Sequence, residues 1–159
     1  MSQSGILLVV MALASHNQQV QHVQAEKAET TCLTQALYYE ARGEGERGQE
    51  AVAEVILDRA RNGAHRRSVC SVVREPGQFS FITDGSMLHR IDWEAWQSSE
   101  DLARRILHGE VVTRYTKQAL YYHAVSIRPD WADSMVRTAQ IGNHVFYRER
   151  RRASQPISG

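Results

Sequence analysis

The chain has 159 residues, of which 42% are hydrophobic and 23% are charged, and its formal net charge is +1. This length predicts one domain that is large enough to bury a core. The balanced charge gives no argument for nucleic-acid binding by the chain as a whole, and the spacing of its cysteines and histidines is not that of a zinc site.

The N-terminus has the pattern of an export signal. The first fourteen residues carry no charged side chain, and an apolar run over residues 5–13 ends in the A-x-A pattern of residues 12–14. About ten apolar residues are too few to span a bilayer, which needs about 20. We predict a signal peptide over residues 1–14 and export to the periplasm or to the extracellular cell wall, without stable membrane insertion. Because no Lys or Arg precedes the run, the alternative is a frayed N-terminal helix or a misassigned start.

A polar segment separates this signal from the domain. Residues 15–31 are rich in Gln and lack apolar periodicity, which is typical of a linker. The first helix is expected from about Thr31 to Arg42, and Gly43 is expected to end it. The domain then covers residues 32–148, and residues 149–159 are expected to form a disordered basic tail.

Glu40 lies on the apolar face of this first helix. Leu33, Ala36 and Leu37 occupy positions i, i+3 and i+4, and Glu40 occupies i+7. A carboxyl group on the core side of a helix is costly unless it is paired or used, and partial burial raises its pKa toward the range of a general acid. Glu40 is therefore a candidate acid. The alternative is a structural ion pair with an arginine such as Arg42 or Arg59.

Further helices are expected before any strand. The apolar pattern predicts a second helix over about residues 47–61, a short helix capped by Ser68, and a helix that starts near Ser98 and ends at His108. Residues 78–81 alternate amide or hydroxyl side chains with aromatic ones. Such alternation suits a sugar-binding loop, and it is equally typical of a half-buried strand.

The last third of the domain has the pattern of strands. Residues 119–127 are strand-like, and residues 135–141 and 144–148 flank a Gly-Asn turn, which predicts a hairpin. Helices in the N-terminal half and a small antiparallel sheet in the C-terminal half make an α+β fold.

Four side chains could form a cross-link or bind a metal. Cys32 and Cys70 would close a loop of about 38 residues if oxidised, which stabilises a fold by roughly 3–4 kcal/mol. In a cytosolic protein they would be two buried thiols. His123 and His144 lie within apolar segments, where a histidine is a metal ligand, a proton carrier or a hydrogen-bonded core residue. We expect no metal site.

The domain resembles the SleB/CwlJ-type cell-wall hydrolases, which include the spore-cortex-lytic enzymes. The resemblance covers about residues 32–148. The residues that carry it are Glu40-Ala41-Arg42-Gly43-Glu44, Gly48-Gln49, Ala51-Val52-Ala53, Ser68-Val69-Cys70, Gln78-Phe79-Ser80, Thr116, Ala119, Tyr122-His123, Pro129, Trp131 and Ile141-Gly142-Asn143-His144-Val145-Phe146-Tyr147.

The resemblance implies a lysozyme-like α+β fold that acts on the glycan strands of peptidoglycan. The catalytic glutamate of the family corresponds to Glu40. The family usually has Asn at the position of Asp58, and it usually has a Gly-Ala pair where this chain has Gln118-Ala119. The second departure bears on the turn before the Tyr122-His123 strand and not on the acid.

The resemblance further implies a lytic transglycosylase that needs one carboxyl group and no cofactor. Glu40 would protonate the bond between N-acetylmuramic acid and N-acetylglucosamine and then accept the proton of the C6 hydroxyl, which yields a 1,6-anhydro product. Glu44 lies one turn on, at a Cβ distance of about 6 Å on a continuous helix. Both groups would approach the sugar from one side, so we expect Glu44 to support the site without reacting.

The other expected residues of the site hold or surround the sugar. Like Glu44, His144 is expected to support the site without reacting. The expected partner of the protein is peptidoglycan alone, and the protein is expected to be a monomer. The alternatives are a hydrolytic muramidase, a non-catalytic peptidoglycan-binding module of the same fold, and a histidine-based metal-dependent amidase. The candidate sugar-binding residues are Tyr39, Gln78, Phe79, Ser80, Tyr122, His123 and Trp131.

Overall fold

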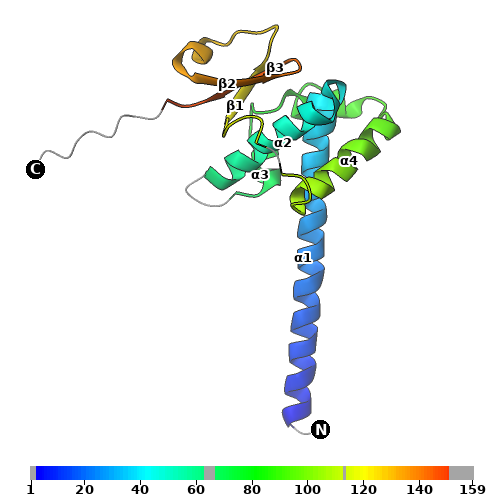
Figure 1. The fold of residues 1–159 in the computed structure, drawn as a ribbon. Helices are drawn as coiled ribbons and strands as arrows, with labels where there is room; N and C mark the ends of the chain where they lie inside the picture. Colours follow the sequence, from blue (N-terminus) through cyan, green and yellow to red (C-terminus); the bar gives the residue numbers. More distant parts are fainter. Residues whose placement is uncertain (1–2, 63–66, 113, 151–159) are drawn as a thin grey trace, which may run out of the picture.

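The structure is a computed structural model, and it describes residues 3–62, 67–112 and 114–150. Helices make up the N-terminal half, and a three-stranded antiparallel sheet lies in the C-terminal half (Figure 1). The expected α+β fold is therefore confirmed. Most of the expected disordered tail falls outside the described residues.

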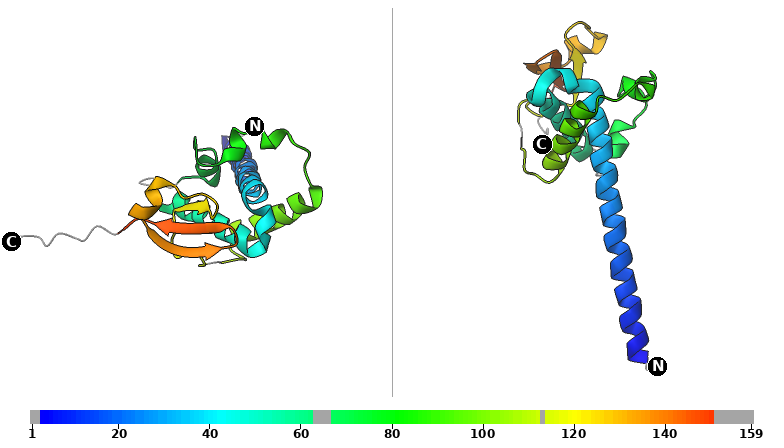
Figure 2. Two further views of the ribbon diagram at one scale, coloured as in Figure 1. Left: turned by 90° about the horizontal axis from the view of Figure 1, so that it is seen from above. Right: turned by 90° about the vertical axis from the view of Figure 1, so that its right-hand side faces the viewer.

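Helix α1 (Gln3–Ala41) is much longer than expected, and the predicted start near Thr31 is wrong. The chain has neither glycine nor proline between Gly5 and Gly43, and Gln, Ala, Glu and Lys are good helix formers. Residues 13–25 are exposed, so this stretch needs no apolar face. It extends away from the rest of the domain (Figures 1 and 2). In the described part of the chain, no helix is both long and apolar enough to span a membrane.

The C-terminal end of α1 packs on α2 (Gly45–Asn62) and α3 (Val69–Val73). The expected second helix is confirmed, and so is the cap of α3, because the Ser68 hydroxyl accepts a hydrogen bond from the Ser71 backbone N–H at 3.0 Å. The residues that form this main core include Leu33, Ala36, Leu37, Val52, Ile56, Val72, Val73 and Phe81.

A disulfide joins α1 to α3. It links Cys32 to Cys70, whose Cα atoms are 5.1 Å apart. Close to this bond, the Glu29 carboxylate of α1 accepts a hydrogen bond from the Val69 backbone N–H at 2.5 Å. The first turn of α3 is thus held to α1 by a covalent bond and by a charged acceptor.

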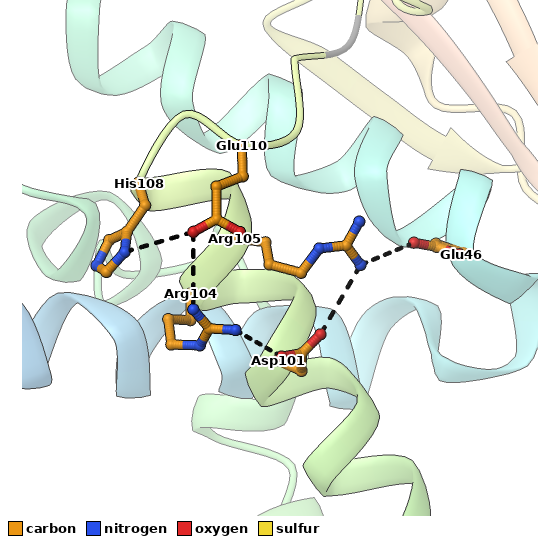
Figure 3. Close-up of polar contacts among 6 residues, drawn as sticks. All are labelled: Glu46, Asp101, Arg104, Arg105, His108 and Glu110. Carbon is orange, nitrogen blue, oxygen red and sulfur yellow. Dashed lines mark hydrogen bonds and ion pairs between the residues drawn. The ribbon is translucent and has the colours of Figure 1, made fainter.

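Helix α4 (Trp93–Leu107) crosses α1 (Figure 1). Its expected start near Ser98 is wrong, because Asp92 caps the helix and its carboxylate accepts a hydrogen bond from the Ala95 backbone N–H at 3.2 Å. An ion pair connects α4 to α2, since an Arg105 nitrogen lies 3.4 Å from a Glu46 carboxylate oxygen, and Arg105 also lies 3.8 Å from Asp101 of its own helix. Figure 3 shows six residues of this network, which are Glu46, Asp101, Arg104, Arg105, His108 and Glu110.

The sheet contains β1 (Tyr121–Ala124), β2 (Val136–Ile141) and β3 (His144–Arg148) in the order β1-β3-β2. The hairpin of β2 and β3 is confirmed, with Gly142 and Asn143 between its strands. Strand β1 is shorter than the expected 119–127, because a turn closed by the Ile127 N–H and the Ala124 carbonyl follows it.

The two faces of the sheet have different neighbours. The inner face packs on α2, and the short helix η4 (Asp130–Ser134) lies at the outer face. The inner cluster consists of Ala51, Val55, Ala119, Ile141 and Phe146 with Tyr122 and Ala139 against it, and the outer cluster consists of Ala132, Val145 and Tyr147 with Tyr121, Trp131 and Met135 against it.

The turn before β1 has a left-handed backbone at two residues that are not glycine. Lys117 has φ +54° and Gln118 has φ +64°. This conformation costs an ordinary side chain roughly 1–2 kcal/mol and costs glycine nothing. The departure from the Gly-Ala pair thus falls at a position whose backbone favours glycine.

Candidate active site

Glu40 lies near the C-terminal end of α1 and is half-buried. Burial raises the pKa of its carboxyl from 4.5 to about 7, and the negative charge of Asp84 adds to the rise. None of the described residues forms a hydrogen bond or an ion pair with this carboxyl. The group is therefore protonated in a large fraction of molecules near neutral pH, as a general acid must be.

The two arginines that could neutralise Glu40 are engaged elsewhere. Arg42 lies over the ring of Tyr38, with its guanidinium carbon 4.6 Å from the ring centroid. Arg59 of α2 is half-buried, and its Nε donates a hydrogen bond to the Leu120 carbonyl at 2.6 Å. The structural ion pair considered for Glu40 does not form with either residue.

Tyr122 of β1 faces Glu40 from the sheet. Burial raises the pKa of its phenol, and the negative charge of Glu40 contributes to the rise. The Tyr122 ring also meets the His144 ring edge-on at 5.1 Å. The neutral phenol of Tyr122, on the inner side of the sheet, thus lies within electrostatic reach of Glu40.

Tyr39 connects the end of α1 to the loop that contains Gln78, Phe79 and Ser80. Its ring stacks on that of Phe81, with centroids 5.0 Å apart and planes at 18°. This loop leads into the short helix η2 (Ser80–Ile82), so it is not the strand that was considered. Gln78 and Ser80 are exposed, whereas Phe79 is 3% exposed and packs in the main core.

Glu44 fastens the β2–β3 turn to the segment that follows α1. Its carboxylate accepts hydrogen bonds from the backbone N–H and the side-chain amide of Asn143, at 2.7 and 3.0 Å. A Cβ atom at Gly142 would overlap this carboxylate. Both hydrogen bonds hold the β2–β3 turn against the segment after α1, which is a structural contact.

His123 and Trp131 are not brought together with Glu40. Adjacent residues of a strand point to opposite faces, so His123 lies on the outer face while Tyr122 lies on the inner one. The His123 ring stacks on Tyr147 at 5.2 Å, its Nε2 is 3.1 Å from the Tyr147 hydroxyl, and it meets Trp131 edge-on at 5.7 Å. These rings pack mainly against one another.

His144 is buried on the inner face behind Tyr122. Burial lowers the pKa of its ring, although the negative charge of Glu44 opposes this effect. Its Nδ1 has no hydrogen-bond partner among the described residues. Nor does the described part of the chain contain a group of three or more His, Cys, Asp or Glu side chains arranged to hold a metal ion.

Asp84 is the residue of this site that sequence reasoning missed. The sequence analysis gave it no role at the site, yet its negative charge adds to the raised pKa of Glu40 from another part of the chain. No sequence pattern relates the two positions, because the link depends on the packing of Phe81 against Tyr39.

Two curated relatives are spore cortex-lytic enzymes, from Bacillus subtilis (strain 168) and Oceanobacillus iheyensis. Each is 33% identical to this chain, over 119 and 120 residues. The match covers 72% of this chain in both cases, but only 35% and 39% of the relatives. The chain thus spans little more than a third of the length of these proteins.

Two solved structures have a similar fold. The catalytic domain of the Bacillus cereus SleB protein has a TM-score of 0.59 and 28% identity, over 77% of this chain and 91% of that chain. The catalytic domain of the germination-specific lytic transglycosylase SleB from Bacillus anthracis has a TM-score of 0.59 and 29% identity, over 76% and 94%.

The family described as Cell Wall Hydrolase matches residues 43–147. The matched segment begins shortly after Glu40 and includes Glu44, Tyr122 and His144. The resemblance noted from the sequence is confirmed, and the chain belongs to the Cell Wall Hydrolase family.

Proposed function

We propose that this chain cleaves the glycan strands of peptidoglycan and that Glu40 is its general acid. The observation that carries the proposal is a half-buried carboxyl with a pKa of about 7 and no ion-pair partner among the described residues. Membership of the Cell Wall Hydrolase family supports the substrate class.

The reaction we propose is that of a lytic transglycosylase. Protonated Glu40 gives its proton to the oxygen between N-acetylmuramic acid and N-acetylglucosamine, and the bond from that oxygen to the anomeric carbon breaks. The N-acetyl group of the substrate stabilises the positive charge. Glu40, now a carboxylate, takes the proton of the muramic C6 hydroxyl, whose oxygen bonds to the anomeric carbon. The similar B. anthracis structure, at 29% identity, is that of a germination-specific lytic transglycosylase, which supports this route.

Hydrolysis is the second candidate. Ordinary glycosidases use two carboxyl groups, and Asp84 supplies a second one in electrostatic contact with Glu40. In that reaction a water molecule, and not the C6 hydroxyl, would attack the anomeric carbon. The products of the two routes differ in mass by one water.

The residues proposed to hold the sugar are those on the Glu40 side of the sheet. Tyr122 would donate a hydrogen bond to the sugar, and part of the Tyr39 ring would pack against it. Gln78 and Ser80 would form hydrogen bonds with its acetamido and hydroxyl groups. His123 and Trp131 lie on the outer face, and Phe79 lies in the core, so they would act through packing.

Export remains part of this proposal. The apolar N-terminal run is the proposed signal, and the Cys32–Cys70 bond suits an oxidising compartment such as the periplasm or cell exterior. We propose that the exported domain works as a monomer.

The test compares wild type with Glu40→Gln on purified cell walls, with mass spectrometry of the released muropeptides. Wild type should release anhydro-muramyl products, and Glu40→Gln should release them at a rate at least 100-fold lower, as expected when a general acid is lost (on the order of 10²–10⁴). Glu100→Gln, the same change on the exposed side of α4, is the control and should match wild type. Undiminished release by Glu40→Gln would exclude Glu40 as the acid, and binding to walls without release by wild type would favour a non-catalytic module.

A further inference from the structure

A groove lined by charged side chains runs along α2 to the edge of the sheet. It consists of two neighbouring hollows, of about 620 and 880 Å³, whose walls share Asp58, Arg61, Lys117 and Gln118. The first hollow lies between α2 and the segment that follows α4, and the second lies between the end of α2 and the start of β2. Glu40 lines neither hollow, so this α2 groove is separate from the site of the proposed acid.

The turn before β1 forms the middle of the α2 groove, and a carboxylate of α2 holds it in place. Glu54 accepts hydrogen bonds from the backbone N–H groups of Tyr115 and Thr116, at 2.8 and 3.2 Å. The next two residues, Lys117 and Gln118, have left-handed backbones and exposed side chains. Backbone strain of this kind is concentrated at functional sites. Here it accompanies a fixed turn that presents two polar side chains to the groove.

The second hollow carries an excess of positive charge. Its walls contain four cationic side chains against two carboxylates. Among the described residues, only one of these cations forms an ion pair, which joins Arg61 to Asp58 at 3.7 Å. The hollow therefore attracts an anionic group. The cations are Arg61, Lys117, Arg137 and Arg148, and the carboxylates are Asp58 and Glu149.

The first hollow adds negative charge on the side of α2. Glu50, Glu54 and Asp58 line it, and because they are spaced four residues apart they lie on one face of the helix. A polymer that carries only phosphates would be repelled by these carboxylates. A ligand that carries both carboxylates and an amine matches the two hollows together.

The α2 groove also reaches the edge of the sheet. Val136, Arg137 and Thr138 of β2 line the second hollow. Strand β2 is the last strand in the order β1-β3-β2, and no strand in the described part of the chain pairs with its outer edge. The backbone N–H and C=O groups of such an edge can bind an extended peptide. The groove thus offers backbone partners as well as charged ones.

We propose that the α2 groove binds the peptide stems of peptidoglycan. The carboxylates of a stem lie against the cations beside β2, and the amine of its diamino acid lies against the carboxylates of α2. The inference rests on the proposed function, which supplies the substrate class, and adds a second binding site to it. The end of α1 that carries Glu40 leads into the start of α2, whereas Arg61 lies at the far end of this 18-residue helix, which is about 27 Å long. The groove therefore holds the substrate at a distance from the reacting bond.

The binding test uses free peptide stems, which an amidase releases from purified walls, and isothermal titration calorimetry. The variant combines Lys117→Gln with Arg148→Gln, which removes two charges and keeps side chains of polar character. Each exposed ion pair contributes about a two- to fivefold change in affinity, so the Kd should rise about fivefold to twentyfold. The control combines Lys27→Gln with Arg74→Gln, which removes two exposed charges outside the groove and should leave the Kd unchanged.

The kinetic test compares glycan strands that carry stems with the same strands after an amidase has removed them. Wild type should have a lower KM on the strands with stems. The double variant should lose this difference and keep the wild-type kcat on both substrates, because the groove lies away from Glu40. High salt should raise the wild-type KM on strands with stems, since the charges are exposed.

Three results would overturn the proposal. They are a Kd that is the same in wild type and the groove variant, an equal loss in the control variant, and binding of a phosphate-rich wall polymer in place of stems. The binding test needs no cleavage, so the two proposals can fail separately. Wild type that binds stems but releases no muropeptides would refute the proposed function, whereas wild type that cleaves strands but binds no stems would refute the role of the groove.

Discussion

Glu44 and Asn143 are separated by 99 positions in the chain, yet the Glu44 carboxylate accepts hydrogen bonds from both the backbone N–H and the side-chain amide of Asn143. The bonds tie the tip of the β2–β3 hairpin to the short helix η1 (Arg42–Glu44), directly after the helix that carries Glu40. The position of the sheet relative to the acid thus depends on this contact.

Glu44→Ala should destabilise the fold and reduce turnover, because it removes both bonds. Hydrogen bonds to a charged acceptor contribute up to about 3 kcal/mol when buried, so about 1–2 kcal/mol is expected at this exposed site. Urea unfolding measures the loss. Glu44→Gln keeps one acceptor oxygen and should lose less than half as much. Equal midpoints for wild type and Glu44→Ala would show that the contact does not stabilise the fold.

Gln118→Gly should stabilise the protein. Position 118 is exposed and has φ +64°, which glycine adopts without strain. Relief of this strain stabilises the folded state, whereas the additional conformational entropy that glycine loses on folding opposes it. The free energy of unfolding should therefore rise by about 0.5–1 kcal/mol. Gln118→Ala removes the same side chain and keeps the strain, so it should leave thermal unfolding unchanged. A gain of similar size in both variants would assign the effect to the side chain and not to the backbone.

Tyr122→Phe and Tyr147→Phe remove one hydroxyl each from opposite faces of the sheet. Tyr122 faces Glu40, so its variant should lose roughly tenfold or more in kcat, as when one donor to a reacting centre is removed. Tyr147 bonds to His123 at 3.1 Å on the outer face, so its variant should lose about 1 kcal/mol of stability and keep its kcat. Loss of turnover in Tyr147→Phe alone would place the sugar on the outer face.

Stability should fall as pH rises past neutrality because of Glu40. Its pKa is 4.5 when unfolded and about 7 when folded, so the folded state holds the proton more tightly. The stabilising contribution is complete below pH 4.5 and is lost as pH rises through 7, a change of up to about 3 kcal/mol. Glu40→Gln cannot ionise, so its unfolding midpoint in urea should exceed that of wild type at pH 8 and match it at pH 4. A difference that does not vary with pH would show that the carboxyl is not perturbed.

Local patterns in the sequence predicted several helices and strands correctly. The apolar spacing of Leu33, Ala36 and Leu37 placed Glu40 on the buried side of a helix, and the Gly-Asn pair between two strand-like runs predicted the hairpin. The long N-terminal part of α1 was missed, because an exposed helix needs good helix formers and no apolar face. The early start of α4 was missed in the same way, since its cap at Asp92 lies before the apolar pattern begins.

The chain by itself determined the helices around Glu40, the hairpin and the family resemblance, because periodicity and turn residues act over a few neighbouring positions. Tertiary structure alone decided which face of the sheet Glu40 meets, and hence that Tyr122 lies near it while His123 lies on the other side. It also brought the Glu44 carboxylate to Asn143. These contacts join distant segments, and they form only when helices and sheet pack on a common core.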